Sequence, residues 1–384
     1  MRTPEKPVYF DNAATTWPKP REVGRAVLRA MEDAGGNPGR GAHSLSVSAA
    51  REVFDCRAEL ADFFNIRRPE NVVFTMNATY ALNLAIKSMI RPGSRVICSQ
   101  FEHNSVRRPL AAMGCAVSRF DPRLPRERVL SEVEALLRRG AGAVVCTHAS
   151  NVAPLCVPVR GIAALCHKYG AVCIVDASQS AGILDLDIGA LGADAVCFPG
   201  HKGLYGPAGC GVCVFGERLD PACLAQVIEG GSGVNSADAG MPGLLPERFE
   251  AGTLPVPAVA GLRAGLRVLS REGVASVRGR EFSLAARARE VIGNTPGAVL
   301  YDPPGADGPV VLFNLGGLPP ERTAAALDSA GICVRAGLHC APDAHRALGT
   351  LPEGACRLSF GMFNTEAELE YFARTVKSIV DHDK

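Results

Sequence analysis

Lys202 is the residue whose surroundings first suggest covalent chemistry. Lysine is rare in this chain, with seven lysines among 41 basic residues. Lys202 lies in a segment of turn residues, Pro199-Gly200-His201-Lys202-Gly203, directly after an apolar run. A lysine in a tight, partly desolvated loop can lose its proton and form a Schiff base with an aldehyde cofactor. The alternative, from these residues alone, is an ordinary loop lysine.

Asp176 and Gln179 follow another apolar run, residues 171–175. A carboxylate at this place could be a helix N-cap. It could also pair with a pyridinium nitrogen and keep the ring protonated, so that the ring acts as an electron sink. Gln179, one turn later, could donate a hydrogen bond to a ring oxygen.

Two further segments could complete a cofactor pocket. The run Asn77-Ala78-Thr79 precedes an apolar helix-like stretch, so its backbone amides could bind a phosphate. An ordinary capped helix is the alternative for this run. His103 follows an expected strand, where it could stack on a ring and shuttle protons, although a lone histidine is often structural.

Cys340 stands apart among the 14 cysteines. It lies in an expected turn, next to His339 and near Arg335, and neighbouring positive charge favours the nucleophilic thiolate. Other cysteines lie inside apolar runs, where a free thiol packs as a small hydrophobic group in a reduced protein. Examples are Cys98, Cys146, Cys173 and Cys197.

The elements that must position these residues follow from an alternation of short apolar runs and helix-like stretches between residues 70 and 215. This pattern predicts an α/β fold with a mostly parallel seven-stranded sheet flanked by helices. The expected strands are 71–75, 95–99, 116–120, 143–148, 171–176, 193–198 and 211–215, and the expected helices lie near 79–90, 104–113, 127–139 and 160–169. Active sites in such sheets gather at the carboxyl ends of the strands, where the polar residues fall.

The rhythm of the sequence changes after about residue 257. There the pattern predicts a smaller C-terminal α+β domain, with a capping box at Thr365–Glu368 starting its last helix. Its expected strands are 310–314, 332–335 and 356–360, and its expected helices lie near 275–293, 320–330 and 365–381. We place the large domain at residues 16–260 and the small domain at 261–384, completed by residues 1–15. The turn-rich segment 229–255 predicts a long functional loop.

Composition excludes several classes of function. There are 41 basic and 39 acidic residues without a block of like charges, which argues against a nucleic-acid binder or a membrane-surface protein. The chain has no secretory signal and no apolar run of about 18 residues, so we expect a cytoplasmic protein without a membrane span. Cys210 and Cys213 form a C-x-x-C pattern, for which redox chemistry or metal binding is the alternative to packing. We expect them to pack on opposite faces of a strand, and we expect no metal site.

Eight motifs follow one another along the chain. They are Asp11-Asn12-Ala13-Ala14-Thr15, Gly39-Arg40-Gly41-Ala42-His43, Glu102-His103-Asn104, Ser150-Asn151-Val152, Asp176-Ala177-Ser178-Gln179, Gly200-His201-Lys202, Phe249-Glu250-Ala251-Gly252-Thr253, and Arg357-Leu358-Ser359-Phe360 through Asn364-Thr365. In type and order they resemble the motifs of cysteine desulfurases, which are class V aminotransferase-like, fold type I pyridoxal-phosphate enzymes. The resemblance extends from residue 8 to about residue 380.

The resemblance implies roles for the cofactor residues. Lys202 looks like the Schiff-base lysine and the base at the substrate Cα. Asp176 would pair with the pyridine nitrogen, Gln179 with the phenolic oxygen, and His103 would stack on the ring. Ala78, Thr79 and His201 would hold the phosphate, and Asn151 would also contact the cofactor. The family is dimeric with a shared site, so Thr253 would reach the cofactor of the other subunit.

The resemblance also implies the substrate and the reaction. Arg357 resembles the arginine that binds the substrate carboxylate, with Asn151, Ala13 and Arg335 nearby. Cys340 would receive sulfur from L-cysteine as a persulfide, leaving L-alanine, and pass it to an acceptor protein of unknown identity.

Two features depart from the usual pattern of the family. Pro199 and Ala78 each replace a residue with a hydroxyl, which alters the expected phosphate contacts. The alternatives on the same fold are an aminotransferase, or a lyase acting on selenocysteine or another β-substituted amino acid. An alternative of a different class is a non-catalytic sulfur carrier.

Overall fold

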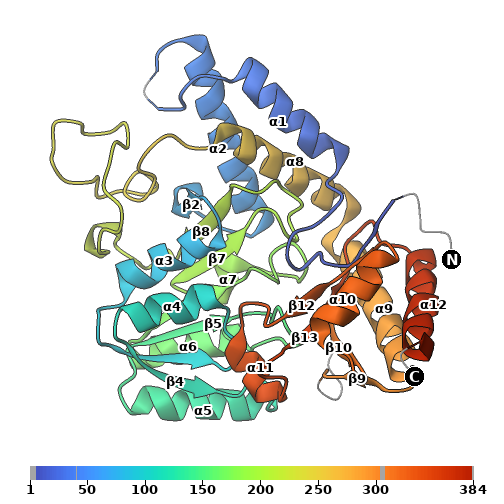
Figure 1. The fold of residues 1–384 in the computed structure, drawn as a ribbon. Helices are drawn as coiled ribbons and strands as arrows, with labels where there is room; N and C mark the ends of the chain where they lie inside the picture. Colours follow the sequence, from blue (N-terminus) through green and yellow to red (C-terminus); the bar gives the residue numbers. More distant parts are fainter. Residues whose placement is uncertain (1–5, 40, 303–307, 383–384) are drawn as a thin grey trace.

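A seven-stranded sheet forms the centre of the larger part of the molecule (Figure 1). The computed structural model describes residues 6–39, 41–302 and 308–382. In spatial order the strands are β2 (Val72–Thr75), β8 (Gly211–Phe215), β7 (Ala195–Pro199), β6 (Val172–Asp176), β5 (Ala143–Thr147), β3 (Arg95–Ser99) and β4 (Ala116–Phe120). Strand β8 runs antiparallel to both of its neighbours, and all other pairs are parallel. The predicted mostly parallel seven-stranded sheet is confirmed.

Helices cover both faces of this sheet, which explains why its central strands are apolar throughout. Helices α3 (Ala78–Met89) and α4 (Asn104–Ala112) contribute to one core, and α5 (Arg126–Arg138) and α6 (Val159–Tyr169) to the core on the other face. The short helix α7 (Ile188–Leu191) and the 3₁₀ turns Pro69–Asn71 and Pro221–Cys223 lie in connections. Cys210 belongs to one core and Cys213 to the other, so these two cysteines pack on opposite faces as predicted.

Two helices near the N-terminus were not predicted from the sequence. Helices α1 (Arg21–Asp33) and α2 (Ser44–Phe63) both pack against α8 (Val256–Glu272). In α1 only Val23 and Ala30 are buried. Between the Pro221–Cys223 turn and α8, the described chain forms a long loop without helix or strand, which projects away from the sheet in Figure 1.

The C-terminal part is built on a four-stranded antiparallel sheet with the strand order β12-β13-β10-β9. These strands are β12 (Arg335–Gly337), β13 (Ala355–Ser359), β10 (Val310–Leu315) and β9 (Ala298–Leu300). Its helices are α9 (Val274–Gly293), α10 (Pro320–Ser329), α11 (Pro342–Leu348) and α12 (Glu366–His382). The capping box is present, because the Thr365 amide donates to Glu368 Oε2 at 2.7 Å and the Glu368 amide donates to Thr365 Oγ1 at 3.3 Å.

The N-terminal segment joins this smaller part. Strand β1 (Val8–Tyr9) pairs in parallel with β11 (Ile332–Cys333), and Phe10 lies in the small core. The single strand predicted at 332–335 is therefore wrong in detail, since β11 and β12 pair with different partners on either side of Val334. The domain boundary predicted at residue 260 falls inside α8 and stays a prediction.

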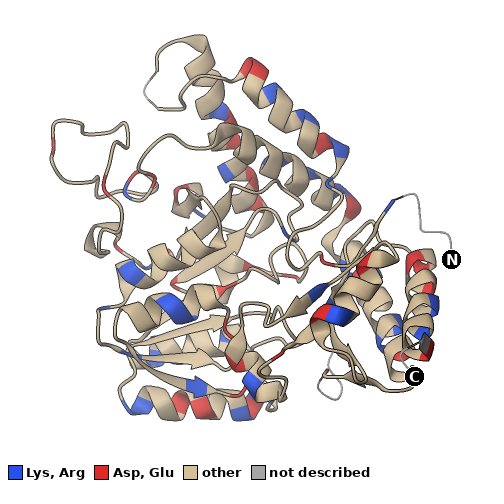
Figure 2. Ribbon diagram, in the orientation of Figure 1, with Lys and Arg blue, Asp and Glu red and all other residues tan. Residues whose placement is uncertain are grey.

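Charged residues of both signs lie on helices α1, α5 and α12 (Figure 2). Among the described residues, no helix combines the length and the apolar character that a bilayer span requires.

Candidate active site

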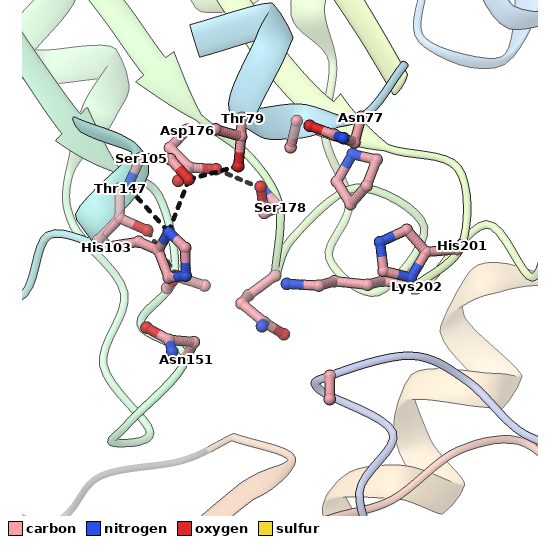
Figure 3. A pocket seen from close by; sticks show the side chains of 15 residues that line it. Asn77, Thr79, His103, Ser105, Thr147, Asn151, Asp176, Ser178, His201 and Lys202 are labelled. Carbon is pink, nitrogen blue, oxygen red and sulfur yellow. Dashed lines mark hydrogen bonds between the residues drawn. The ribbon is translucent and has the colours of Figure 1, made fainter. Parts of the chain in front are cut away.

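A pocket of about 320 Å³ lies at the carboxyl ends of β5, β6 and β7 (Figure 3). Neighbouring parallel strands end at the same sheet edge, which brings residues from distant parts of the chain together. The pocket is lined by eight of the residues predicted from the sequence. They are Ala78, Thr79, His103, Asn151, Asp176, Gln179, His201 and Lys202.

Lys202 lies in the turn that follows β7. Its carbonyl accepts hydrogen bonds from the Tyr205 amide at 2.8 Å and from Thr16 Oγ1 at 3.2 Å, so the turn is bound to the N-terminal segment. Gly203 permits this packing, because a Cβ there would lie 2.4 Å from the Ala181 carbonyl oxygen. Burial lowers the pKa of Lys202 to about 8, although Asp176 opposes the shift. A fraction of this amine is therefore unprotonated near neutral pH.

Asp176 ends β6 and is buried. One of its carboxylate oxygens, Oδ1, accepts a hydrogen bond from the Ser178 amide at 2.9 Å. Gln179, on the following turn, donates from Nε2 to the Ala13 carbonyl at 2.8 Å, and this bond fixes its side chain at the pocket wall. The predicted residue Ala13 thus lies behind Gln179, outside the lining of the pocket.

The start of α3 forms the end of the pocket that suits a phosphate. Asn77 caps the helix by accepting from the Tyr80 amide at 3.1 Å, and the amides of Ala78 and Thr79 lie in the first turn, where helical amides have no intrahelical partner. His201 lines the same pocket, and its buried Nδ1 has no hydrogen-bond partner among the described residues. These donors fit the phosphate of pyridoxal phosphate.

His103 lies on the side of the pocket opposite His201 and caps α4 (Figure 3). Its Nδ1 accepts from the Ser105 amide at 3.1 Å and lies 2.8 Å from Ser105 Oγ, which in turn lies 2.7 Å from Thr79 Oγ1. Burial lowers the pKa of His103, while Asp176 raises it. Because Nδ1 accepts from an amide, the neutral ring carries its proton on Nε2. Ser105, Ser178 and Thr147 also line the pocket and were not predicted.

Arg357, on β13, lies buried beside the pocket. Its Nη2 donates to Asp11 Oδ1 at 2.8 Å and its Nη1 donates to the Asn151 carbonyl at 2.9 Å, whereas its Nε has no partner among the described residues. Arg335 is half exposed and donates to Asp11 Oδ2 at 3.0 Å. No role was predicted for Asp11, although it begins the first of the eight motifs.

Cys340 lies in the turn between β12 and α11, and its side chain is exposed. Both His339 (φ 49°) and Cys340 (φ 57°) adopt the left-handed conformation, which is uncommon for residues other than glycine. Two hydrogen bonds hold the turn. The His339 carbonyl accepts from Asn151 Nδ2 at 2.8 Å, and the Cys340 carbonyl accepts from the Asn104 amide at 2.7 Å. Cys340 is thus tied to the two segments that supply Asn151 and His103 to the pocket.

Thr253 lies outside the pocket, on the exposed end of the long loop, where its Oγ1 accepts from Asn37 Nδ2 at 3.2 Å. Its predicted role toward a partner subunit stays a prediction. Among the described residues, no group of three or more His, Cys, Asp or Glu side chains is arranged to hold a metal ion.

Comparisons with known proteins agree over most of the chain. The family model described as aminotransferase class-V matches residues 8–372. A probable cysteine desulfurase of Methanothermobacter thermautotrophicus is 32% identical, with 97% of this chain and 94% of that protein covered. A cysteine desulfurase of Enterobacter sp. is also 32% identical, with 97% and 93% covered.

Solved structures agree with this result. The apo structure of a cysteine desulfurase from Thermococcus onnurineus superposes with a TM-score of 0.88 at 30% identity, covering 100% of this chain and 99% of that one. The cysteine desulfurase CsdA of Escherichia coli superposes with a TM-score of 0.86 at 26% identity, covering 98% and 95%.

Proposed function

The chain belongs to the aminotransferase class-V family. We propose that it is a cysteine desulfurase that uses pyridoxal phosphate. Its substrate would be L-cysteine, its product L-alanine, and its first sulfur acceptor Cys340. The observation that carries this proposal is the set of contacts of Asn151. This one residue lines the pocket, accepts from Arg357 through its carbonyl and donates to the carbonyl of His339, next to Cys340.

The residues of the pocket would hold the cofactor at three places. The first-turn amides of α3, with Thr79 and His201, would bind its phosphate. Asp176 would keep a proton on the ring nitrogen, and Lys202 would bind the aldehyde carbon. When bound, pyridoxal phosphate supplies the electron sink for the negative charge that develops at the substrate Cα.

The side chains then divide the work on the substrate. Arg357, whose Nε has no hydrogen-bond partner among the described residues, would bind the substrate carboxylate and so place the Cα near Lys202. The low pKa of Lys202 suits an amine that removes a proton. The Cys340 thiolate would attack the substrate sulfur. A bond between the two sulfurs forms while the Cβ–S bond breaks, and its electron pair stays on the carbon side, where proton uptake gives the methyl group of alanine.

The test is incubation with L-cysteine, with alanine and protein-bound persulfide measured together. We expect equal initial amounts of both. Pyruvate, ammonia and free sulfide without alanine or persulfide would instead support a β-lyase, because β-elimination releases the sulfur as sulfide. An oxo acid that keeps its sulfur, formed with transfer of the amino group to the cofactor and without release of ammonia, would support an aminotransferase. A protein that binds no cofactor and turns over nothing would support a sulfur carrier.

We further propose that the enzyme is a homodimer whose sites are shared. Large apolar side chains are exposed at the start of α3, beside the pocket, and on the long loop. They are Met76, Tyr80, Ile228 and Leu244, the last exposed to 73%. Thr253, on the same loop, would reach the partner's phosphate site. Light scattering measures the mass of the protein in solution and so its oligomeric state. Mixed dimers of Lys202→Ala and Thr253→Ala chains would regain activity, because one of their two shared sites would contain both an intact Lys202 and an intact Thr253.

The cytoplasm is the compartment we propose for this enzyme. Cys197 and Cys213 are buried on adjacent strands with their sulfurs 3.8 Å apart, and no disulfide joins them. Thiols that remain reduced at such a distance are typical of a reducing compartment. Fractionation of the source cells followed by immunodetection tests the assignment.

A further inference from the structure

Tyr205 is a buried residue at the end of the Lys202 turn, and the proposed chemistry does not use it. Its side chain is 1% exposed. Its backbone has φ 58°, a left-handed conformation that is costly for a bulky aromatic residue and persists only where the surroundings enforce it. Its amide donates to the Lys202 carbonyl at 2.8 Å. The position of the phenol ring is therefore coupled to that of Lys202 through three residues of a tight turn.

The hydroxyl of Tyr205 bonds to two elements of the C-terminal part. It donates to Glu281 Oε1 in α9 at 2.9 Å and accepts from the Met362 amide at 2.7 Å. A hydroxyl has one proton to donate and lone pairs to accept, so both bonds form together. Burial raises the pKa of Glu281 to about 8, which leaves this carboxyl neutral at pH 7. A neutral partner avoids an unpaired buried charge at the junction.

These two bonds connect the two halves of the proposed catalytic machinery. Met362 lies three residues beyond β13, the strand that carries Arg357. Lys202 belongs to the turn after β7 of the large sheet. The N-terminal segment bridges the same halves less directly, through Thr16 on the Lys202 carbonyl and Ala13 on Ser359.

We propose that the Tyr205 hydroxyl is a positioning group that sets the Lys202 amine relative to Arg357. The inference rests on the proposed function, in which Arg357 holds the substrate carboxylate while Lys202 removes the proton from Cα. A shift of about 1 Å between two such groups can cost about 100-fold in rate. Loss of the hydroxyl should therefore slow proton removal at Cα, while the residues that bind substrate and cofactor remain.

The test compares Tyr205→Phe with Tyr371→Phe in the cofactor-loaded enzyme. Tyr371 is a matched control, because its hydroxyl also donates a hydrogen bond, to the Ala330 carbonyl at 2.9 Å, but within the C-terminal part. We expect Tyr205→Phe to lower kcat for L-cysteine roughly 10- to 100-fold, with KM changed less than threefold. The deuterium isotope effect with cysteine labelled at Cα should rise, because proton removal becomes rate-limiting. Tyr371→Phe should change none of these quantities.

A rescue variant separates positioning from packing. Glu281→Gln keeps a neutral acceptor for the hydroxyl and should retain nearly wild-type kcat, whereas Glu281→Leu removes the acceptor and should resemble Tyr205→Phe. Unchanged kcat and isotope effect in Tyr205→Phe, or equal losses in Tyr371→Phe, would overturn the inference.

Amide hydrogen exchange tests the same bond without turnover. The Met362 amide should exchange faster in Tyr205→Phe and at the wild-type rate in Tyr371→Phe. A wild-type protein that makes no alanine would refute the proposed function, and the exchange data would still show whether Tyr205 holds the two halves together. Unchanged exchange at Met362 would refute the inference on its own.

Discussion

Replacing Arg357 is the sharpest test of how the substrate is held. In Arg357→Ala, Asp11 keeps one cationic partner, Arg335, and the guanidinium beside the pocket that we assign to the substrate carboxylate is lost. A buried charge-assisted hydrogen-bonded pair of this kind contributes about 2–4 kcal/mol. At about 1.4 kcal/mol per tenfold, that is a rise in KM of roughly 30-fold to several hundred-fold.

The assay is the rate of alanine formation as a function of L-cysteine concentration, together with the affinity for cysteamine, which lacks the carboxylate. The visible absorbance of the bound cofactor should remain, because Arg357 does not line the pocket. Arg357→Lys keeps the charge but lacks the planar fork, so its KM should fall between those of the wild type and Arg357→Ala.

Cysteamine supplies the internal control for this prediction. Its affinity should be the same for the wild type and for Arg357→Ala, since neither protein can use the guanidinium to bind it. A KM for L-cysteine within threefold of the wild type would show that the carboxylate binds elsewhere. An equal loss of affinity for both ligands would show that the substitution disturbs the whole pocket.

Three further predictions concern the proposed nucleophile, the lysine and a buried carboxyl. Cys340→Ser should form alanine at a small fraction of the wild-type rate, and no persulfide should be trapped on the protein. The control Cys173→Ser, in a core strand, should change stability only. Near wild-type turnover by Cys340→Ser would exclude the thiolate mechanism. The apoenzyme should capture pyridoxal phosphate about tenfold faster at pH 9 than at pH 7, and the rate should level off above the Lys202 pKa of about 8. Absorbance and borohydride labelling of Lys202 measure this capture. A rate independent of pH would contradict the lowered pKa of this amine. Relative to Glu281→Gln, the free energy of unfolding of the wild type should fall as the pH rises from 4.5 to about 8, by up to about 1.4 kcal/mol per pH unit. The reason is that the unfolded carboxyl releases its proton near pH 4.5 and the folded one only near pH 8. Urea unfolding at several pH values measures this slope, and parallel curves for the two proteins would refute the prediction.

Much of the large sheet was predictable from local pattern. The strands Arg95–Ser99, Ala116–Phe120 and Gly211–Phe215 have the predicted bounds, and the others differ by one or two residues. Central strands covered on both faces must be apolar throughout, so they stand out against their helical connections. The polar residues at or just beyond the carboxyl ends of these strands, including Asp176 and Lys202, could be placed at one sheet edge because parallel strands end at the same edge.

The pairings that complete the candidate site were not predictable in this way. Asp11 and Arg357 are separated by 346 residues, and Tyr205 and Glu281 by 76, yet each pair is hydrogen-bonded. Local periodicity reports which face of an element is buried, but it carries no information about which distant element covers that face. Contacts between side chains from separate elements depend on how the sheets and helices pack. Only the tertiary structure therefore decides that the Asp11 carboxylate contacts Arg357, and that the Tyr205 phenol joins the Lys202 turn to the C-terminal part.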